Sequence, residues 1–335
     1  MKVWIDLANS PHVPLFRPVV TRLRGAGHAV VLTARDHAQT LPLALETWPE
    51  TEVVGGASPA GRLRKGTAIA GRALALCRFA RRTRPDVALS HGSYAQIAAA
   101  RLARVPAVTM MDYEFQPANH LSFRLAQRVI VPEVFPADAL RRFGARDRKV
   151  VRYAGFKEDL YLGAAASQDV LGDLGVDARR IVAVLRPPPE GALYHRGGND
   201  RFETVLDHLE ADEDVEIVLL PRGREQRERY AARRVHVPEK PVDGTALLAA
   251  ADLVVGAGGT MTREAALLGT PTYTVFMPEL AAVDVELMRR GAITDLRSDG
   301  LPALEKRPQT VRQLDEGRAD AIYETVAATL ADVAR

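Results

Sequence analysis

A strand, a glycine turn and a helix follow one another near residue 256, and this stretch constrains the fold most strongly. An apolar run ends at Val255, the small-residue turn Gly256–Thr260 follows, and a helical pattern then runs to Gly269. Glycines where a strand passes into a helix let backbone N–H groups approach a phosphate, and the helix dipole favours its negative charge. We expect the Thr260 hydroxyl also to cap the helix. The pattern predicts an α/β fold with a phosphate site at Gly258, Gly259 and Thr260.

Short apolar runs alternate with helical patterns along both halves of the chain, as in Lys2–Leu7 and the helix expected from about Leu15 to Gly25. This alternation predicts parallel sheets with helices on both faces. The second half repeats this topology without repeating the sequence. We therefore predict two doubly wound Rossmann-like domains with an interdomain cleft. Their bounds are residues 1–154 and residues 155–310, followed by a C-terminal helix, residues 311–335, which packs back on the first domain.

The composition restricts the partners and cofactors that the chain can use. Its 335 residues are 47% hydrophobic, which suffices for two domains of ordinary size. A net charge of only +3 and an aromatic content of 6% argue against nucleic acid as a partner. Cys77 is the single cysteine and the histidines lack metal-ligand spacing, so neither a metal nor another cofactor is expected. We predict a cytoplasmic protein, since no apolar run approaches the roughly 20 residues that span a bilayer.

A long helix with many basic residues is predicted over residues 62–82. Basic amphipathic helices attract anionic lipids, so this helix is a candidate for peripheral contact with the inner face of the membrane. The alternative is a domain helix with a solvated basic face.

Polar side chains follow three strands of the first predicted sheet. The carboxyl ends of parallel strands gather at the edge where ligands bind. There His12, Asp112 or Glu114 would serve as a general base, and the alternative is that they cap helices or bind loop amides. The candidate catalytic residues are His12, Asp112 and Glu114, and the candidate substrate-binding residues are Asn9, Ser10, His91 and Ser93.

Two arginines follow strands of the second predicted sheet. Arg222 and Arg186 each end an apolar run, and Arg186 precedes three prolines. A guanidinium group at such a position can bind a diphosphate with two hydrogen bonds and stabilise it as a leaving group. The alternative is a pair of surface arginines in an arginine-rich chain.

The glycine turn is similar to a signature of the non-hydrolysing UDP-GlcNAc 2-epimerases and related glycosyltransferases of GT-B architecture. The matching residues are Gly258-Gly259-Thr260, Glu264-Ala265 and Leu268-Gly269-Thr270-Pro271. This resemblance implies a GT-B fold in which Gly258, Gly259 and Thr260 face a diphosphate and Glu264 binds the ribose hydroxyls.

The whole chain resembles an archaeal and bacterial family known as domain of unknown function 354. The segments that carry this resemblance are WIDLANSPHVPLF, SHGSYAQ, MMDYEF and YAGFKEDLYL. The epimerase acid/base set is not reproduced, because Ser93 stands where those enzymes carry an acidic residue. The segment Met111–Phe115 likewise lacks their His-x-Glu-Ala-Gly element.

These observations together predict a metal-independent glycosyltransferase that uses a nucleotide-sugar donor, a UDP-sugar, as its substrate. The acceptor would be a glycan or a lipid-linked molecule of surface polysaccharide synthesis. One alternative is a sugar-nucleotide epimerase or hydrolase, and another is a non-catalytic protein that binds nucleotide-sugars.

Overall fold

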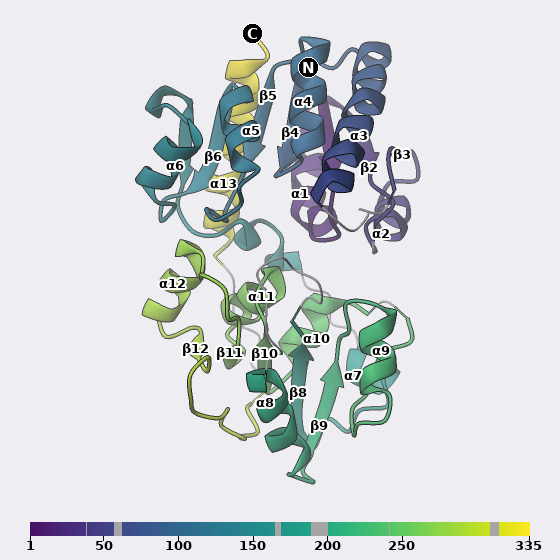
Figure 1. Ribbon diagram of the computed structural model, residues 1–335, viewed down its shortest axis with the longest axis vertical. Coiled ribbons are helices and arrows are strands. Elements are labelled where there is room, and N and C mark those ends of the chain that lie inside the picture. Colours follow the sequence, from purple (N-terminus) through teal and green to yellow (C-terminus); the bar gives the residue numbers. More distant parts are fainter. Residues whose placement is uncertain (38, 57–61, 165–168, 189–199, 241, 309–314) are drawn as a thin grey trace. The chain divides into compact units, whose positions relative to one another are not determined.

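The computed structural model describes residues 1–37, 39–56, 62–164, 169–188, 200–240, 242–308 and 315–335. These residues form two compact units, each with one parallel sheet (Figure 1). The first unit comprises Met1–Tyr161, Ala281–Val283 and Asp315–Arg335. The second comprises Leu162–Leu280 and Asp284–Leu314.

Seven parallel strands form the sheet of the first unit, in the order β3-β2-β1-β4-β5-β6-β7. The strands are β1 (Lys2–Leu7), β2 (Ala29–Ala34), β3 (Glu52–Val53), β4 (Val87–His91), β5 (Ala107–Met110), β6 (Arg128–Pro132) and β7 (Val150–Tyr153). The central strands are apolar and buried on both faces, as parallel strands between two helical layers must be. The strand order reverses between β1 and β4, and ligands of doubly wound sheets bind at such a reversal.

Helices cover both faces of this sheet. They are α1 (His12–Gly25), α2 (Thr40–Thr47), α3 (Arg62–Thr83), α4 (Tyr94–Ala103), α5 (Asn119–Leu125), α6 (Ala137–Phe143) and α13 (Glu316–Val333), with the short 3-10 helices η1 (Asp147–Lys149) and η2 (Lys157–Leu160). Helix α4 packs between α3 and α5, while α13 packs on β4 to β7 (Figure 1). The C-terminal helix thus belongs to the same unit as the N-terminal strands.

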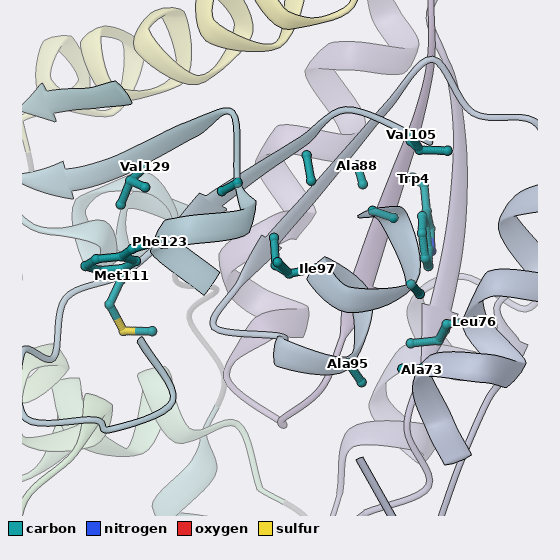
Figure 2. Close-up of a cluster of buried hydrophobic side chains, with 14 of the residues drawn as sticks. Trp4, Ala73, Leu76, Ala88, Ala95, Ile97, Val105, Met111, Phe123 and Val129 are labelled. Atoms are coloured by element: carbon teal, nitrogen blue, oxygen red, sulfur yellow. The ribbon is translucent and has the colours of Figure 1, made fainter. Parts of the chain in front are cut away.

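A buried cluster fills the space between the first sheet and helices α3, α4 and α5. Figure 2 shows Trp4 of β1 near Leu76 of α3, and Phe123 of α5 near Val129 of β6. The Trp4 ring also lies 5.5 Å from the ring of Phe79, measured between centroids. Because side chains alternate along a strand, the residues next to Trp4 face the opposite helical layer. This core fixes the first sheet from one side.

Five parallel strands form the sheet of the second unit, in the order β12-β11-β10-β8-β9. The strands are β8 (Ile181–Arg186), β9 (Val215–Leu219), β10 (Leu253–Gly256), β11 (Thr272–Thr274) and β12 (Thr294–Asp295). The helices are η3 (Leu162–Ala164), α7 (Val170–Asp173), α8 (Asp200–Glu210), α9 (Arg224–Tyr230), α10 (Gly244–Ala250), α11 (Thr260–Leu268) and α12 (Ala282–Arg289). Here the order reverses between β8 and β10, and the glycine turn follows β10 at this reversal. Ligands of doubly wound sheets generally bind at such a reversal.

Two local expectations, the start of the first helix and the cap of α11, differ from the structure. Helix α1 begins at His12 and not near Leu15, because prolines fit the first turn of a helix, where no intrahelical N–H bond is lost. Beside β9, His236 forms a single parallel bridge with Val218. Thr260 is the first helical residue of α11, and Gly259 occupies the N-cap position without a side-chain cap. Within the described ranges, no helix is long and apolar enough to cross a membrane.

Candidate functional site

A buried ion pair lies at the β1–β4 reversal of the first unit. Asp6 of β1 accepts two hydrogen bonds from Arg72 of α3, at 2.8 and 2.9 Å, and one each from Thr33 and Ser93. Arg72 also donates to the carbonyl of Val54 at 2.8 Å. Burial alone would raise the pKa of Asp6, but the charge of Arg72 and these hydrogen bonds outweigh it and lower the pKa. The carboxylate therefore stays charged and joins β1, α3 and the start of α4.

Ser93 has two structural roles that the sequence did not reveal. Its hydroxyl donates to Asp6 at 2.5 Å and accepts from the backbone N–H of Gln96, so it caps helix α4. The predicted substrate contacts Asn9 and Ser10 lie in the loop after β1, where the Ser10 hydroxyl is 3.3 Å from that of Thr40. Of these three, Asn9 and Ser93 line a cavity of the first unit.

His12 is buried in the first turn of α1 and presents an N–H rather than a lone pair. Its Nδ1 accepts a hydrogen bond from the backbone N–H of Ala8 at 3.1 Å. Burial, followed by the nearby His91, lowers the pKa of His12 to about 3. The neutral ring must then carry its proton on Nε2. This geometry favours a hydrogen-bond donor over the general base expected at His12.

The depressed pKa of His12 predicts a pH dependence of stability. In the unfolded chain His12 binds a proton near its ordinary pKa of 6.5, whereas the folded protein resists protonation down to about 3. Stability should therefore fall as the pH drops below 6.5. Between about pH 7 and about pH 5, the native protein should lose about 2 kcal/mol more than the variant His12→Gln. Urea unfolding of both proteins at a series of pH values measures this difference. An unchanged dependence of stability on pH in His12→Gln would contradict the assignment.

A second buried cluster of charged residues lies at the carboxyl ends of β4, β5 and β7. The Nε2 atom of His91 lies 3.2 Å from Oδ1 of Asp112, and Lys157 Nζ lies 2.5 Å from the other carboxylate oxygen. Lys157 also pairs with Glu158. The His12 and His91 ring centroids are 5.5 Å apart. The structure thus brings three predicted residues together, namely His12, His91 and Asp112, and adds Lys157 and Glu158.

Glu114, the third predicted catalytic residue, is hydrogen-bonded through both its side chain and its main chain. One carboxylate oxygen accepts from the N–H of Ala282 at 2.7 Å, and Ala282 lies in the short segment that belongs to the first unit. Arg142 donates to the backbone carbonyl of Glu114. In the part of the chain that the structure describes, no group of three or more His, Cys, Asp or Glu residues is arranged to hold a metal ion.

The glycine turn of the second unit has the conformation that only glycine adopts easily. Gly258 and Gly259 have φ values of +82° and +98°. A Cβ atom on Gly258 would lie 2.4 Å from the ring of Phe276, and one on Gly256 would lie 2.0 Å from the hydroxyl of Thr262. That hydroxyl is buried and has no hydrogen-bond partner among the described residues. The path of the turn therefore requires glycine at positions 256 and 258, where a side chain would meet Thr262 or Phe276.

Arg222 joins the glycine turn to the end of β8. Its guanidinium donates to the carbonyl of Pro187 at 2.9 Å and to that of Gly258 at 3.4 Å. Arg222 is exposed overall, so a positive charge lies beside the turn at the protein surface. Arg186 lies opposite Gly256 in the β8–β10 register, but its guanidinium donates to the carbonyls of Leu220 and Pro221. Arg186 thus holds the end of β9, while Arg222 borders the turn.

Helix α11 carries Glu264 one turn beyond Thr260, and the side chain of Glu264 is half-buried. The helix is fixed by a buried ion pair in which Arg263 donates to Asp284 of α12 at 2.6 and 3.0 Å. A rigid α11 holds its N-terminal N–H groups and Glu264 at a constant separation.

Four charged residues of the first unit were missed by the sequence analysis: Asp6, Arg72, Lys157 and Glu158. The sequence contains an indication for two of them, Asp6 and Lys157. Asp6 interrupts an otherwise apolar strand, and a charge in a buried strand must be paired. Lys157 follows Gly155-Phe156 directly after a strand, in one of the family-like segments. No sequence pattern pairs Arg72 with Asp6, because 66 positions separate them.

Comparison with known proteins identifies a family and a sequence relative. The family described as protein of unknown function (DUF354) matches residues 1–299. The uncharacterized protein MJ0665 of Methanocaldococcus jannaschii is 29% identical over 297 residues, which cover 87% of this chain and 86% of that protein.

Solved structures with the same fold include two epimerases. UDP-GlcNAc 2-epimerase of Neisseria meningitidis, bound to UDP-GlcNAc, has a TM-score of 0.71 at 15% identity, covering 99% of this chain and 100% of the other. The enzyme of Methanocaldococcus jannaschii, in complex with UDP-GlcNAc and UDP, has a TM-score of 0.71 at 12% identity, covering 98% and 100%. Anabaena Alr3699/HepE, in complex with UDP and glucose, has a TM-score of 0.58 at 16% identity, covering 99% and 95%. The predicted GT-B fold is thereby confirmed.

Proposed function

The chain belongs to the family described as protein of unknown function (DUF354), and we propose that it is a metal-independent glycosyltransferase with a UDP-sugar as donor. The reaction would serve the synthesis of surface polysaccharide or of a lipid-linked glycan. The observation that carries this proposal is the position of Arg222 beside the glycine turn at the β8–β10 reversal. Similarity to proteins solved with UDP or UDP-GlcNAc supports the choice of nucleotide.

The donor half of the proposed site uses the second unit. Backbone N–H groups at Gly258, Gly259 and Thr260 would bind the diphosphate, and Arg222 would stabilise the charge that develops on it as it leaves. Glu264 would accept hydrogen bonds from the ribose hydroxyls. No metal is needed in this arrangement, since the guanidinium and the helix N-terminus supply the positive charge.

The acceptor half would use the first unit, with His91 as the base. The Nε2 atom of His91 lies 3.2 Å from an oxygen of Asp112, although the two do not form a hydrogen bond. In this proposal the proton of the neutral ring is on Nε2, beside the carboxylate, and Nδ1 carries the lone pair. Asp112 itself is paired with Lys157, and Glu114 binds the N–H of Ala282. In the proposed step Nδ1 takes the proton of an acceptor hydroxyl, and the hydroxyl oxygen bonds to the anomeric carbon. The bond from that carbon to the diphosphate breaks, and UDP leaves with the electron pair.

Binding and release of UDP test this proposal. We expect UDP and UDP-sugars to raise the melting temperature of the protein. We also expect UDP to be released from the bound sugar nucleotide only when an acceptor is added. Lack of stabilisation by any of UDP, GDP, TDP, CMP and their sugars would sink the proposal. Binding without turnover would indicate a non-catalytic protein.

An epimerase is the second candidate, because two of the similar structures are UDP-GlcNAc 2-epimerases that match nearly the whole chain. Such an enzyme would convert the sugar of UDP-GlcNAc, and this conversion is visible by NMR without an acceptor. Sugar conversion in the absence of acceptor would replace the transferase with the epimerase, and UDP release without acceptor would indicate a hydrolase.

Glu264→Ala should discriminate between parts of the nucleotide. If Glu264 binds the ribose, its loss should weaken UDP binding about tenfold, as expected for a hydrogen bond to a charged group, and leave inorganic diphosphate unchanged. Isothermal titration calorimetry with both ligands measures the two effects. The exposed residue Glu213 provides the control Glu213→Ala, which should change neither affinity. Equal losses for UDP and diphosphate would show that Glu264 is not a ribose ligand.

A further inference from the structure

A surface pocket of about 720 Å³ lies in the first unit, where helices α5 and α6 end and β7 begins. Helix α6 packs beside α5 at this side of the first sheet (Figure 1). Most residues that line this basic pocket are cationic, and one is acidic. The cationic residues are Arg124, Arg141, Arg146, Arg148 and Lys149, and the acidic one is Asp147. Such an excess of positive charge attracts anions.

The basic pocket lies at the edge of the sheet opposite to the candidate site. Lys149 directly precedes β7 and α5 ends just before β6, so the pocket lies at the amino ends of these two strands. The cluster of His91, Asp112 and Lys157 lies at the carboxyl ends of strands in the same parallel sheet. A ligand of the basic pocket is therefore distinct from the donor and the acceptor of the proposed reaction.

Two of the cations have a structural role at the end of helix α5. Lys149 donates to the carbonyls of Arg124 and Ala126, at 2.9 and 2.8 Å. Arg124 donates to the carbonyls of His120 and Phe143, at 2.9 and 3.0 Å. Cations commonly bind the last carbonyls of a helix in this way. These two side chains therefore shape the pocket.

The other three arginines have no such partners. The side chains of Arg141, Arg146 and Arg148 are exposed, and none of them forms an ion pair or a hydrogen bond with a described residue. Burial lowers the pKa of Lys149, and the charges of Arg148 and Arg146 lower it further. The cations thus repel one another around the pocket, and Asp147 pairs with none of them. An anion bound there would relieve this repulsion and accept hydrogen bonds from the guanidinium groups.

The lining also limits the chemistry of the anion. Apart from Gly144 and Ala145, every described lining residue is charged, so the lining offers neither an aromatic ring for a base nor a large apolar side chain for an acyl chain. A guanidinium group binds phosphate oxygens with two parallel hydrogen bonds. Three such groups around one pocket fit several linked phosphates better than a single one. A pocket, unlike a flat basic face, favours a compact soluble molecule over a membrane surface.

We propose that the basic pocket binds a compact soluble anion that carries several phosphate groups, held by Arg141, Arg146 and Arg148. The site is argued from the first unit alone and goes beyond the proposed function. Because the binding groups are exposed charges, the affinity should fall as the salt concentration rises.

Tripolyphosphate, inorganic phosphate and citrate are suitable probes, because they separate the number of phosphate groups from negative charge in general. Calorimetry on the full chain should show tripolyphosphate binding at least about tenfold more tightly than the other two, since it contacts several guanidinium groups at once. Arg146→Ala and Arg148→Ala should each weaken tripolyphosphate about tenfold and leave the melting temperature unchanged. Asp147→Asn should tighten binding about two- to fivefold, because it removes a like charge. The control Arg78→Ala, which removes an exposed arginine of α3, should leave the affinity unchanged.

Tripolyphosphate resembles the diphosphate of the proposed donor, so a second pair of titrations separates the two sites. Arg222→Ala should weaken UDP and leave tripolyphosphate unchanged, whereas Arg146→Ala should leave UDP unchanged. If Arg222→Ala weakens tripolyphosphate and Arg146→Ala does not, the anion binds in the second unit and the proposal fails. Failure of UDP to bind any form of the protein would refute the proposed function and leave the basic pocket standing.

Three further outcomes overturn the proposal. Equal affinity for inorganic phosphate would show a site for a single anion, and equal affinity for citrate would show a site without preference for phosphate. Equal weakening in Arg78→Ala would show attraction to the net charge of the chain. Binding to vesicles of phosphatidylcholine and phosphatidylglycerol that is lost in Arg146→Ala, without binding of tripolyphosphate, would show that this surface contacts a membrane.

Discussion

Replacing Arg72 by methionine should lower the free energy of unfolding by about 3–5 kcal/mol, because the change leaves the charge of Asp6 buried without its partner. Asp6 is fully buried and Arg72 is its only ion-pair partner among the described residues. Methionine keeps most of the volume of the arginine stem, so the expected loss comes from the charge. Urea unfolding of both proteins at neutral pH measures it.

Two further variants separate the ion pair from the packing of the helix. Arg78→Met, on the exposed side of α3, should change stability by less than about 0.5 kcal/mol. The double variant Asp6→Asn/Arg72→Met should regain part of the loss, since it leaves no charge buried. A double variant that is no more stable than Arg72→Met would show that the loss is due to packing.

The dependence of stability on pH provides an independent test of the Asp6–Arg72 ion pair. In the native protein the lowered pKa of Asp6 stabilises the fold above its ordinary pKa of 3.8, and this stability is lost as the pH falls through the folded value. In Arg72→Met only burial and the hydroxyl hydrogen bonds remain, so the pKa of Asp6 should rise. In the variant, protonation of Asp6 would then remove the buried charge at a higher pH than in the native protein. The difference in the free energy of unfolding between Arg72→Met and the native protein should therefore shrink as the pH is lowered.

The glycine turn could be predicted from the sequence because its determinants are local. An apolar run, a small-residue turn and a helical pattern are contiguous, and the φ values of Gly258 and Gly259 follow from that path of the chain. The alternation of strands and helices likewise predicted two parallel sheets. The strand ends then indicated which loops carry polar residues, and His12, His91 and Asp112 do gather in the first unit.

The charge state of these residues could not be predicted, because it depends on contacts distant in sequence. His12 is a donor because the N–H of Ala8 occupies its Nδ1 and because the core buries it. Asp112 is paired with Lys157, 45 positions later in the chain. Arg186 and Arg222 are alike in sequence, yet one binds the end of β9 and the other borders the turn. Only the three-dimensional positions of their neighbours separate the two.

Gly258→Ala should weaken UDP binding by about two orders of magnitude, because a displacement of about 1 Å in a positioning element has effects of that size. The new Cβ atom would lie 2.4 Å from the ring of Phe276, so the turn or the ring must move. The backbone N–H groups of the turn and the carbonyl that Arg222 contacts would move with it. We also expect a loss of about 2–4 kcal/mol of stability, from a positive φ at alanine and from overpacking.

Gly259→Ala is the matched control, since Gly259 has a similar φ but no atom within 4 Å of the Cβ position. It should show the cost of the backbone conformation alone, about 1–3 kcal/mol, and a smaller loss of UDP affinity. The difference between the two variants measures the contact with Phe276. Adding Phe276→Ala to Gly258→Ala should therefore restore part of the lost UDP affinity, with a favourable coupling of about 1–3 kcal/mol. If the two glycine variants bind UDP equally well, or if Phe276→Ala restores nothing, the path of this turn does not determine nucleotide binding.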